Sequence, residues 1–277
     1  MPFLNMQDGK PMIKIHISFW LAAVVFWALG LGVTFIMAAA AVSAHELAHV
    51  LTAKAFGCKI GQLKISALGE MALVHQLDKL SAWKRGAIYA AGPLCNLLLW
   101  VGLLPFETGL FGFYNLILFG FNLLPIFPLD GARLVQLWLG NRVGVLTANR
   151  LILRAGFVCC VVLMLLGVVQ AVLYAPNFSM LLAGFVLWRR NRGIRPELTG
   201  EFYMAMLKKP ARLAPARLVC AHSSQPLSPI VDSMGWDNIL IVITLENNIA
   251  ISEPQIIKHI STNGSNGTLA DIIPAQK

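Results

Sequence analysis

Two histidines four residues apart, with a glutamate directly after the first, lie in an apolar stretch of this 277-residue chain. They form the HELAH motif at residues 45–49. Residues four apart share one face of a helix, so His45 and His49 can bind one metal ion. Glu46 stands where hydrolytic zinc sites keep their general base, and ionisable groups in an apolar span mark function. The motif therefore predicts a metal centre that activates water.

A third metal ligand is needed, because hydrolytic zinc takes three protein ligands and keeps one position open for water. The best candidate is Asp130, near the end of the segment NLLPIFPLDG at residues 122–131. Its two prolines break a helix and its glycine permits an unusual turn, so the carboxylate can be turned inward. A helix N-cap, ahead of a helix from Gly131 to Leu139, is the alternative role for Asp130.

The chemistry of such a site follows from its residue types. Zinc lowers the pKa of a bound water to about 7. Glu46 takes the proton of that water as it attacks a peptide carbonyl, and then passes it to the leaving amine. We therefore expect peptide hydrolysis in an apolar environment that water reaches through a polar path.

The composition places most of the chain in lipid. Hydrophobic residues make up 57% and charged residues 13%, whereas a soluble domain carries about 25% charge. Residues 1–14 are polar, and no small-residue cleavage site follows, so we expect a retained first span. The net charge of +9 indicates positively charged cytoplasmic loops rather than a nucleic-acid partner. The cysteines, an odd number without paired spacing, are expected to fill the core.

Six apolar segments are candidate transmembrane spans. The second carries the HELAH motif, and the fourth leads into the proline-rich break. Their approximate bounds are Ile15–Leu31, Val33–Phe56, Ala87–Leu104, Leu110–Phe127, Leu151–Tyr174 and Phe178–Trp188.

The basic residues of the loops predict the orientation of these spans. Lysine and arginine occur only in alternate connections, and every basic connection falls on one side of the membrane together with Lys10 and Lys14. Cytoplasmic loops carry the excess of Lys and Arg, so both termini are predicted to be cytoplasmic. The basic loop residues are Lys59, Lys64, Lys79, Lys84, Arg85, Arg133, Arg142, Arg150, Arg189, Arg190, Arg192 and Arg195.

Two further segments are not predicted to cross the membrane. Residues 58–80 alternate polar and apolar side chains and predict a short hairpin near the active site. After a membrane domain at 1–195 and an amphipathic linker at 196–217, residues 218–277 read as a small α/β unit. In that unit we expect strands at 239–243 and 249–252, then a helix at 255–260.

The two motifs together resemble the site-2 protease family of intramembrane zinc metalloproteases. HELAH in the second span and NLLPIFPLDG after the fourth match its paired motifs, and Gly92–Asn96 resembles a further family segment, GPxxN. The resemblance covers about residues 15–190. It implies zinc ligands His45, His49 and Asp130, the base Glu46, and a membrane-tethered protein substrate. It also makes Asn122 and Asn96 candidates for binding the substrate backbone or supporting the oxyanion.

The C-terminal unit is similar to a single cystathionine-β-synthase-type (CBS) repeat. Such repeats work in pairs and often bind adenine nucleotides, so the similarity implies a homodimer and a possible nucleotide site. Six spans followed by one such repeat looks like the stage IV sporulation protein FB subgroup. That subgroup processes a sporulation sigma-factor precursor in a bacterial inner or forespore-type membrane. Regulatory membrane proteins are further possible partners.

Alternatives remain at the level of sequence. Asn96 could simply bond a neighbouring helix, as polar residues in bundles often do. A membrane metal transporter would need several metal sites along a path. An inactive regulator that binds nucleotide through its tail would not need intact ligands. We predict a mostly α-helical membrane protein: a six-transmembrane-helix bundle with a broken helix and a hairpin, plus the small cytoplasmic α/β unit.

Overall fold

The structure, a computed structural model, describes most of the chain. The described residues are 13–66, 69–75, 77, 80–106, 109–173, 178–207, 215–264 and 267–273, without the side chains of 13–15, 62–66 and 69–75. The chain forms two compact units, Met1–Asn122 and Leu123–Lys277.

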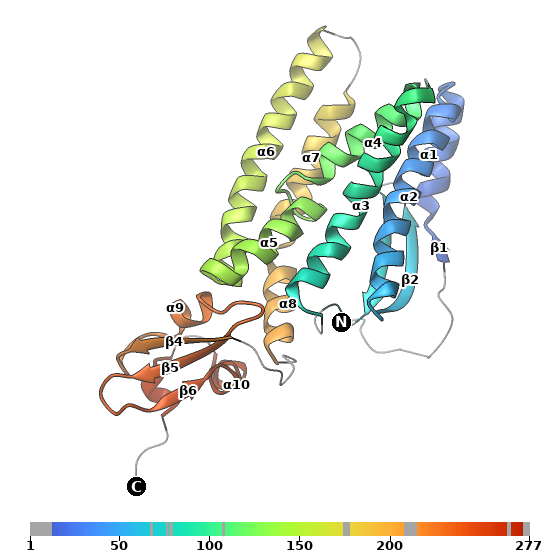
Figure 1. Ribbon diagram of the computed structural model, residues 1–277. Coiled ribbons are helices and arrows are strands. Elements are labelled where there is room, and N and C mark those ends of the chain that lie inside the picture. The colour runs from blue at the N-terminus through green and yellow to red at the C-terminus, as the bar shows by residue number, and fades with distance from the viewer. Residues whose placement is uncertain are drawn as a thin grey trace. The chain divides into compact units, whose positions relative to one another are not determined.

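The first unit combines helices with a small sheet (Figure 1). Helix α2 packs against both α3 and α4. The elements are β1 (Ile13–Ile15), α1 (Ile17–Ala28), α2 (Gly32–Ala55), β2 (Lys59–Ser66), β3 (Gly69–His75), α3 (Ala82–Leu103), the 3-10 turn η2 (Leu104–Phe106) and α4 (Gly109–Asn122).

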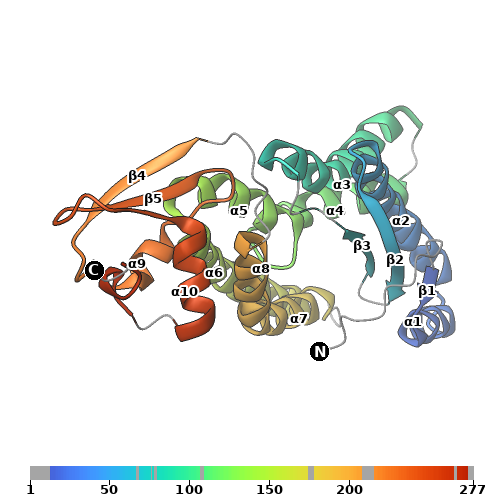
Figure 2. The same ribbon diagram turned by 90° about the horizontal axis from the view of Figure 1, so that it is seen from below.

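The hairpin predicted at residues 58–80 is confirmed by β2 and β3, which pair antiparallel. Strand β1 adds to β2 in parallel, giving the order β1-β2-β3. Figure 2 shows β2 and β3 beside α2. The sequence did not reveal β1, because three residues without a flanking turn are too short for an alternation pattern.

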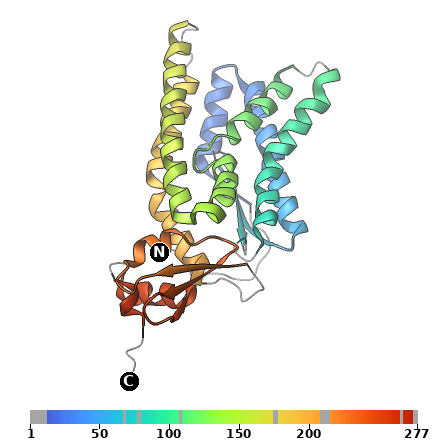
Figure 3. The ribbon, with the colours of Figure 1, turned by 60° about the vertical axis from the view of Figure 1, so that its left-hand side comes forward.

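The second unit holds two long antiparallel helices, α6 and α7, and a second sheet (Figure 3). Its elements are α5 (Asp130–Val143), α6 (Val145–Leu173), α7 (Ser179–Gly193), α8 (Arg195–Leu207), β4 (Ala216–Ala221), α9 (Leu227–Asp232), β5 (Ile239–Thr244), β6 (Ala250–Ser252), α10 (Glu253–Asn263) and the 3-10 turn η3 (Leu269–Asp271).

Each predicted span coincides with a helix, namely α1, α2, α3, α4, α6 and α7. Three of these helices, α2, α3 and α6, are long and apolar enough to cross a membrane, and α1 and α4 are shorter apolar helices. The number of spans therefore stays a prediction. Helix α4 ends at Asn122, whereas the predicted span continued to Phe127. Pro125 explains the early end, because proline disfavours helical backbone in the residue before it.

The segment between α4 and α5 folds back on itself within the second unit. Its Ile126 and Phe127 are fully buried, and the amides of Ile126 and Leu129 donate to the carbonyls of Leu124 and Ile126, both at 2.8 Å. A side chain at Gly131 would overlap the Leu123 carbonyl group. This tight turn places Asp130 at the first position of α5.

The predicted strands and helix of the C-terminal unit are confirmed by β5, β6 and α10. The sheet has the order β4-β5-β6, with β4–β5 parallel and β5–β6 antiparallel. Ser252 and Gln255 form a capping box at the start of α10, which satisfies two amides of its first turn.

The segment predicted as a linker, 196–217, contains most of α8. Phe202 and Met206, four residues apart on one face of α8, are buried in the same core as Leu240 and Val242. The amphipathic pattern of α8 thus reflects burial of one face in this core. Val145, at the start of α6, is fully buried in that core as well.

Small residues let α6 and α7 approach closely. A side chain at Gly167 of α6 would meet the backbone of Leu181 in α7, whereas Gly193 in α7 has no atom within 4 Å of such a position. We predict that Gly167→Ala lowers the thermal unfolding midpoint, because overpacking costs about 1–3 kcal/mol. Gly193→Ala should leave the midpoint unchanged or raise it, since alanine favours helix by about 0.5–1 kcal/mol. Thermal unfolding of both variants in detergent measures this. Equal midpoints would contradict the close α6–α7 contact.

Candidate metal centre

The two histidines of the HELAH motif face one another on α2. Their Nε2 atoms lie 3.1 Å apart, and the ring planes meet at 80°. His45 is buried, with 4% of its surface exposed. The i, i+4 spacing therefore brings two nitrogen lone-pair positions to one point, as the sequence predicted.

A backbone hydrogen bond determines which nitrogen of His49 is available to a metal. Nδ1 of His49 lies 2.6 Å from the carbonyl oxygen of Ile88 in α3. A carbonyl oxygen only accepts, so Nδ1 carries the proton and donates it. The lone pair of neutral His49 is therefore on Nε2. Metal-binding histidines are held in this way by a partner on their other nitrogen.

Asn96 supports His45 from the same helix, α3. It is fully buried, and its side-chain amide lies 3.2 Å from Nδ1 of His45 through Nδ2. Its Oδ1 is buried without a hydrogen-bond partner among the described residues. Amide oxygen and nitrogen exchange places by a 180° rotation and are assigned from the hydrogen-bond network. With Oδ1 turned to Nδ1, Asn96 accepts the Nδ1 proton of His45, and Nε2 is left to bind metal.

Gly92 makes room for both rings. A Cβ atom there would lie 2.6 Å from Nε2 of His45 and closer still to Nε2 of His49. The imidazoles can therefore lie on the backbone of α3 only because residue 92 has no side chain. Pro93 follows inside the same helix.

The donor set fits zinc. Two zinc–nitrogen bonds of about 2.05 Å at the tetrahedral angle place the nitrogens about 3.3 Å apart, close to the observed 3.1 Å. In the described part of the chain, His45, His49 and Asp130 form a group that could hold a metal ion. Each offers one ligand atom, and these atoms lie within 4.8 Å of one another.

Asp130 is not the N-cap of α5, which was the alternative role for this residue. The N-cap of α5 is Leu129, and Asp130 is the first helical residue, partly buried. A carboxylate at the first turn is stabilised by the helix dipole. A metal binds a carboxylate in its ionised form.

The remaining predicted residues lie on α2 and α4. Glu46 is partly buried and follows His45 on α2. Asn122 ends α4, and its Nδ2 donates to the carbonyl of Leu118 at 3.0 Å. Its amide nitrogen is thus used within its own helix, and its oxygen is the atom free to accept. The roles of Asn96 and Asn122 toward a substrate stay predictions.

Cysteine serves packing beside this site. Cys58 is buried in a cluster with Ala53 and Ile88, the residue whose carbonyl holds His49. Burial raises the pKa of the Cys58 thiol above its ordinary value, and nearby Lys84 opposes that rise. A protonated thiol in this cluster behaves as an apolar side chain. The predicted core role thus holds for Cys58 and for buried Cys160, whereas it is wrong for Cys220, which is exposed in β4.

Comparison with known proteins finds similarity to a family of membrane proteases. Peptidase family M50 matches residues 104–163. A zinc metalloprotease of Methanocaldococcus jannaschii is 30% identical over 181 residues, covering 57% of this chain and 51% of that protein. The structure of the site-2 protease from the same organism superposes with a TM-score of 0.53 at 25% identity, covering 69% of this chain and 94% of that one. The chain resembles the site-2 protease family over these stretches.

A further relative is stage IV sporulation protein FB of Bacillus subtilis, 29% identical over 163 residues, which are 55% of this chain and 57% of that protein. The chain thus matches little more than half the length of these two curated relatives. The family match at residues 104–163 includes the proline break and Asp130. Because relatives of the chain are named zinc metalloproteases, zinc is the candidate metal for the group of His45, His49 and Asp130.

Two backbone features of the site were not predicted from the sequence, namely the space at Gly92 and the carbonyl of Ile88. The GPxxN resemblance included Gly92, but no pattern showed that its missing side chain admits the imidazoles. Nor did any pattern single out Ile88, because its carbonyl rather than its side chain acts. A glycine and proline in mid-helix were the available signal, since both cost helix stability and need a reason.

We predict that Gly92→Ala lowers bound zinc at least about tenfold, because its Cβ takes the space of the two Nε2 atoms. Disturbing such supporting geometry costs about 10–100-fold in metal affinity. Metal analysis of the purified variant measures the loss. Gly102→Ala is the matched control, since it adds the same methyl group to α3 where no atom lies within 4 Å. Full zinc occupancy in Gly92→Ala would show that the rings do not need this space.

Proposed function

We propose that the protein is an intramembrane zinc metalloendopeptidase that cleaves a membrane-tethered protein within or beside the bilayer. The observation that carries the proposal is the convergence of the His45 and His49 Nε2 atoms. The Nδ1 atom of each ring contacts a residue of α3. The similarity of the chain to the site-2 protease family supports it. Because the chain covers only part of its relatives, activity and substrate belong to the proposal.

In this proposal His45, His49 and Asp130 hold one zinc ion. Support comes from the closeness of their ligand atoms and from the proline break that brings a carboxylate to the first turn of α5. Zinc bound there would supply a Lewis acid that acidifies water to a pKa of about 7 and polarises a carbonyl oxygen.

The residues of the chain move the proton and hold the reactants. Glu46 accepts a proton from the attacking water and returns it to the nitrogen of the departing amine. Asn96 keeps the His45 ring in one orientation, and the Oδ1 of Asn122 is available to accept a substrate backbone amide. The low dielectric of the apolar surroundings strengthens each of these interactions.

The metal-transporter alternative receives less support. It requires several metal groups along a path, whereas the described residues show the single group of His45, His49 and Asp130. A general-base glutamate also has no task in transport. Because the candidate ligands and Glu46 are all present, the chain is not expected to be an inactive regulator.

The finer features of the proposal rest on the sequence. Six spans with both termini in the cytoplasm follow from the distribution of basic residues. The match to stage IV sporulation protein FB supports a sporulation sigma-factor precursor as substrate in a bacterial inner or forespore-type membrane. Regulatory membrane proteins could then act as partners.

The C-terminal unit is proposed to be a single CBS-like repeat. The order of β5, β6 and α10 agrees with the pattern that suggested it. A single repeat would pair with a second copy, so we propose a homodimer. An adenine nucleotide is its proposed ligand.

We predict that Glu46→Gln abolishes cleavage while zinc stays bound. Glutamine has nearly the same shape but cannot take a proton, and loss of a general base costs about 10²–10⁴-fold in rate. The assay is co-expression with a tethered candidate substrate, followed by metal analysis of the purified protein. Cleavage equal to that of the wild type would refute the proteolytic mechanism.

Asp130→Ala should instead lose the metal, because two histidines alone bind zinc more weakly than three ligands. The measurement is zinc content after purification and dialysis. Glu197→Gln, an exposed acidic residue in α8, is the control for loss of one carboxylate. Unchanged zinc in Asp130→Ala would mean that another residue is the third ligand.

A further inference from the structure

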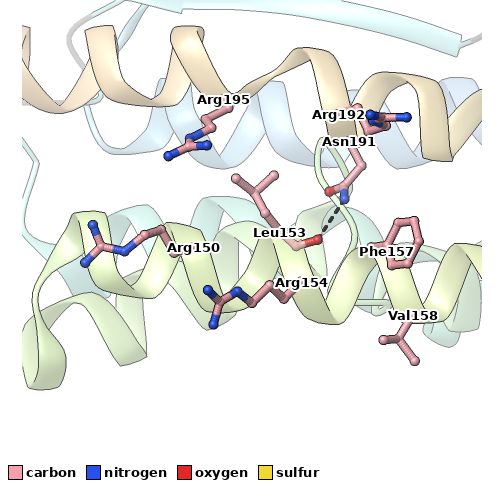
Figure 4. Close-up of a pocket in the computed structure, with 8 residues that line it drawn as sticks. All are labelled: Arg150, Leu153, Arg154, Phe157, Val158, Asn191, Arg192 and Arg195. Atoms are coloured by element: carbon pink, nitrogen blue, oxygen red, sulfur yellow. Dashed lines mark hydrogen bonds between the residues drawn. The ribbon is translucent and has the colours of Figure 1, made fainter.

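A pocket of about 430 Å³ opens between the arginine-bearing ends of α6 and α7 (Figure 4). The start of α6 forms one wall, and the end of α7 with the first residue of α8 forms the other. Nothing in the proposed proteolytic site uses these residues. The pocket is lined by Arg150, Leu153, Arg154, Phe157, Val158, Asn191, Arg192 and Arg195.

Two of the four arginines already have partners. Arg150 forms a bidentate ion pair with Asp232, with nitrogen–oxygen distances of 3.0 and 2.9 Å. The guanidinium carbon of Arg192 lies 5.1 Å from the ring centroid of Trp188. Arg154 and Arg195 are exposed, and the described residues provide neither with a side-chain hydrogen bond or ion pair. Two guanidinium groups therefore lack an anion at the edge of one pocket.

A buried hydrogen bond fixes the geometry between the pocket walls. Asn191 of α7 is 3% exposed, and its Nδ2 donates to the carbonyl of Leu153 in α6 at 3.0 Å (Figure 4). The Oδ1 of Asn191 lies against Gly156, where a side chain would not fit. The two helices are thus joined beneath the arginines, so the cationic groups are held on a preformed site.

The other side of the pocket is apolar. Phe157 and Val158 are 46% and 59% exposed, and over the next two turns of α6 the apolar surface continues with Val162 and Leu165 at 48% and 61%. Helix α6 is long and apolar enough to cross a membrane. Charge at one end and exposed apolar surface along the helix match a molecule with an anionic head and a hydrocarbon tail.

We propose that this pocket, here named the α6–α7 site, binds one anionic phospholipid. Its phosphate lies between Arg154 and Arg195, and its acyl chain runs along Phe157 and Val158. Basic pockets between transmembrane helices on the cytoplasmic side are suited to anionic lipid head groups. An inorganic phosphate or a nucleotide shares the phosphate chemistry but would leave the apolar part of the site exposed.

The lipid would fix the junction of membrane and cytoplasmic parts. Arg195 is the first residue of α8, whose far end is buried in the core of the small sheet. Arg150, in the same pocket, is tied to Asp232 at the end of α9. Both walls of the α6–α7 site therefore connect directly to the C-terminal elements.

The test is native mass spectrometry of the full-length protein released from detergent, with added phosphatidylglycerol or phosphatidylcholine. Wild type should retain one phosphatidylglycerol per chain and bind phosphatidylcholine at least about tenfold more weakly. Arg154→Gln with Arg195→Gln should weaken phosphatidylglycerol binding about tenfold or more. A variant with lysine at both positions should bind phosphatidylglycerol better than the glutamine variant does. Lysine keeps the positive charge and loses only the planar, bidentate guanidinium group.

Arg189→Gln with Arg190→Gln is the matched control. It also removes two arginines, here from the end of α7 beside the pocket, and both residues are exposed and outside the pocket lining. This control should bind phosphatidylglycerol as the wild type does. An unchanged thermal midpoint and zinc content would show that the glutamine variants are folded.

Three results would overturn the proposal. One is equal phosphatidylglycerol binding by the pocket variant and the control variant. Another is equal binding of the two lipids by the wild type. The third is displacement of the lipid by millimolar inorganic phosphate or ATP, which would assign the arginines to a soluble anion. None of these results depends on proteolytic activity.

Discussion

The hydrogen bond from His49 Nδ1 to the Ile88 carbonyl is the interaction on which the candidate metal centre depends. It fixes the ring, places the lone pair on Nε2 and aims it at His45 Nε2. A helix alone brings the two side chains to one face but leaves each ring free to rotate. The second helix, α3, supplies the constraint that turns a shared face into a chelating pair.

That constraint requires close helix contact, and close contact has a local cost. Glycine in a helix interior costs about 1 kcal/mol relative to alanine, and proline removes a backbone donor and disfavours the preceding turn. Gly92 and Pro93 occupy neighbouring positions in α3. In a membrane, van der Waals packing rather than the hydrophobic effect drives helix association. Small residues let two backbones approach closely, and the added packing offsets this cost. The same logic applies to Gly167 of α6.

The sequence predicted side chains whose types carry chemistry better than the contacts that hold them. The spacing of His45 and His49 and the apolar segments were sufficient to predict the paired imidazoles and the positions of the helices. The role of Ile88 was not predictable, because a backbone carbonyl carries no residue-type signal. The amphipathic pattern of α8 was recognised, but its partner was not: a helix face buried against a sheet and one lying on a membrane have the same periodicity.

The C-terminal elements contact α5 and the start of α6 through hydrogen bonds within their unit. Asn141, near the end of α5, accepts the amides of Trp236 and Asp237 at 2.9 and 3.2 Å. The amide of Val145 donates to the Met234 carbonyl at 2.8 Å. Helix α5 begins at Asp130 and ends at Val143. One helix therefore carries the candidate third ligand at its first residue and the contacts to the small unit near its last residues.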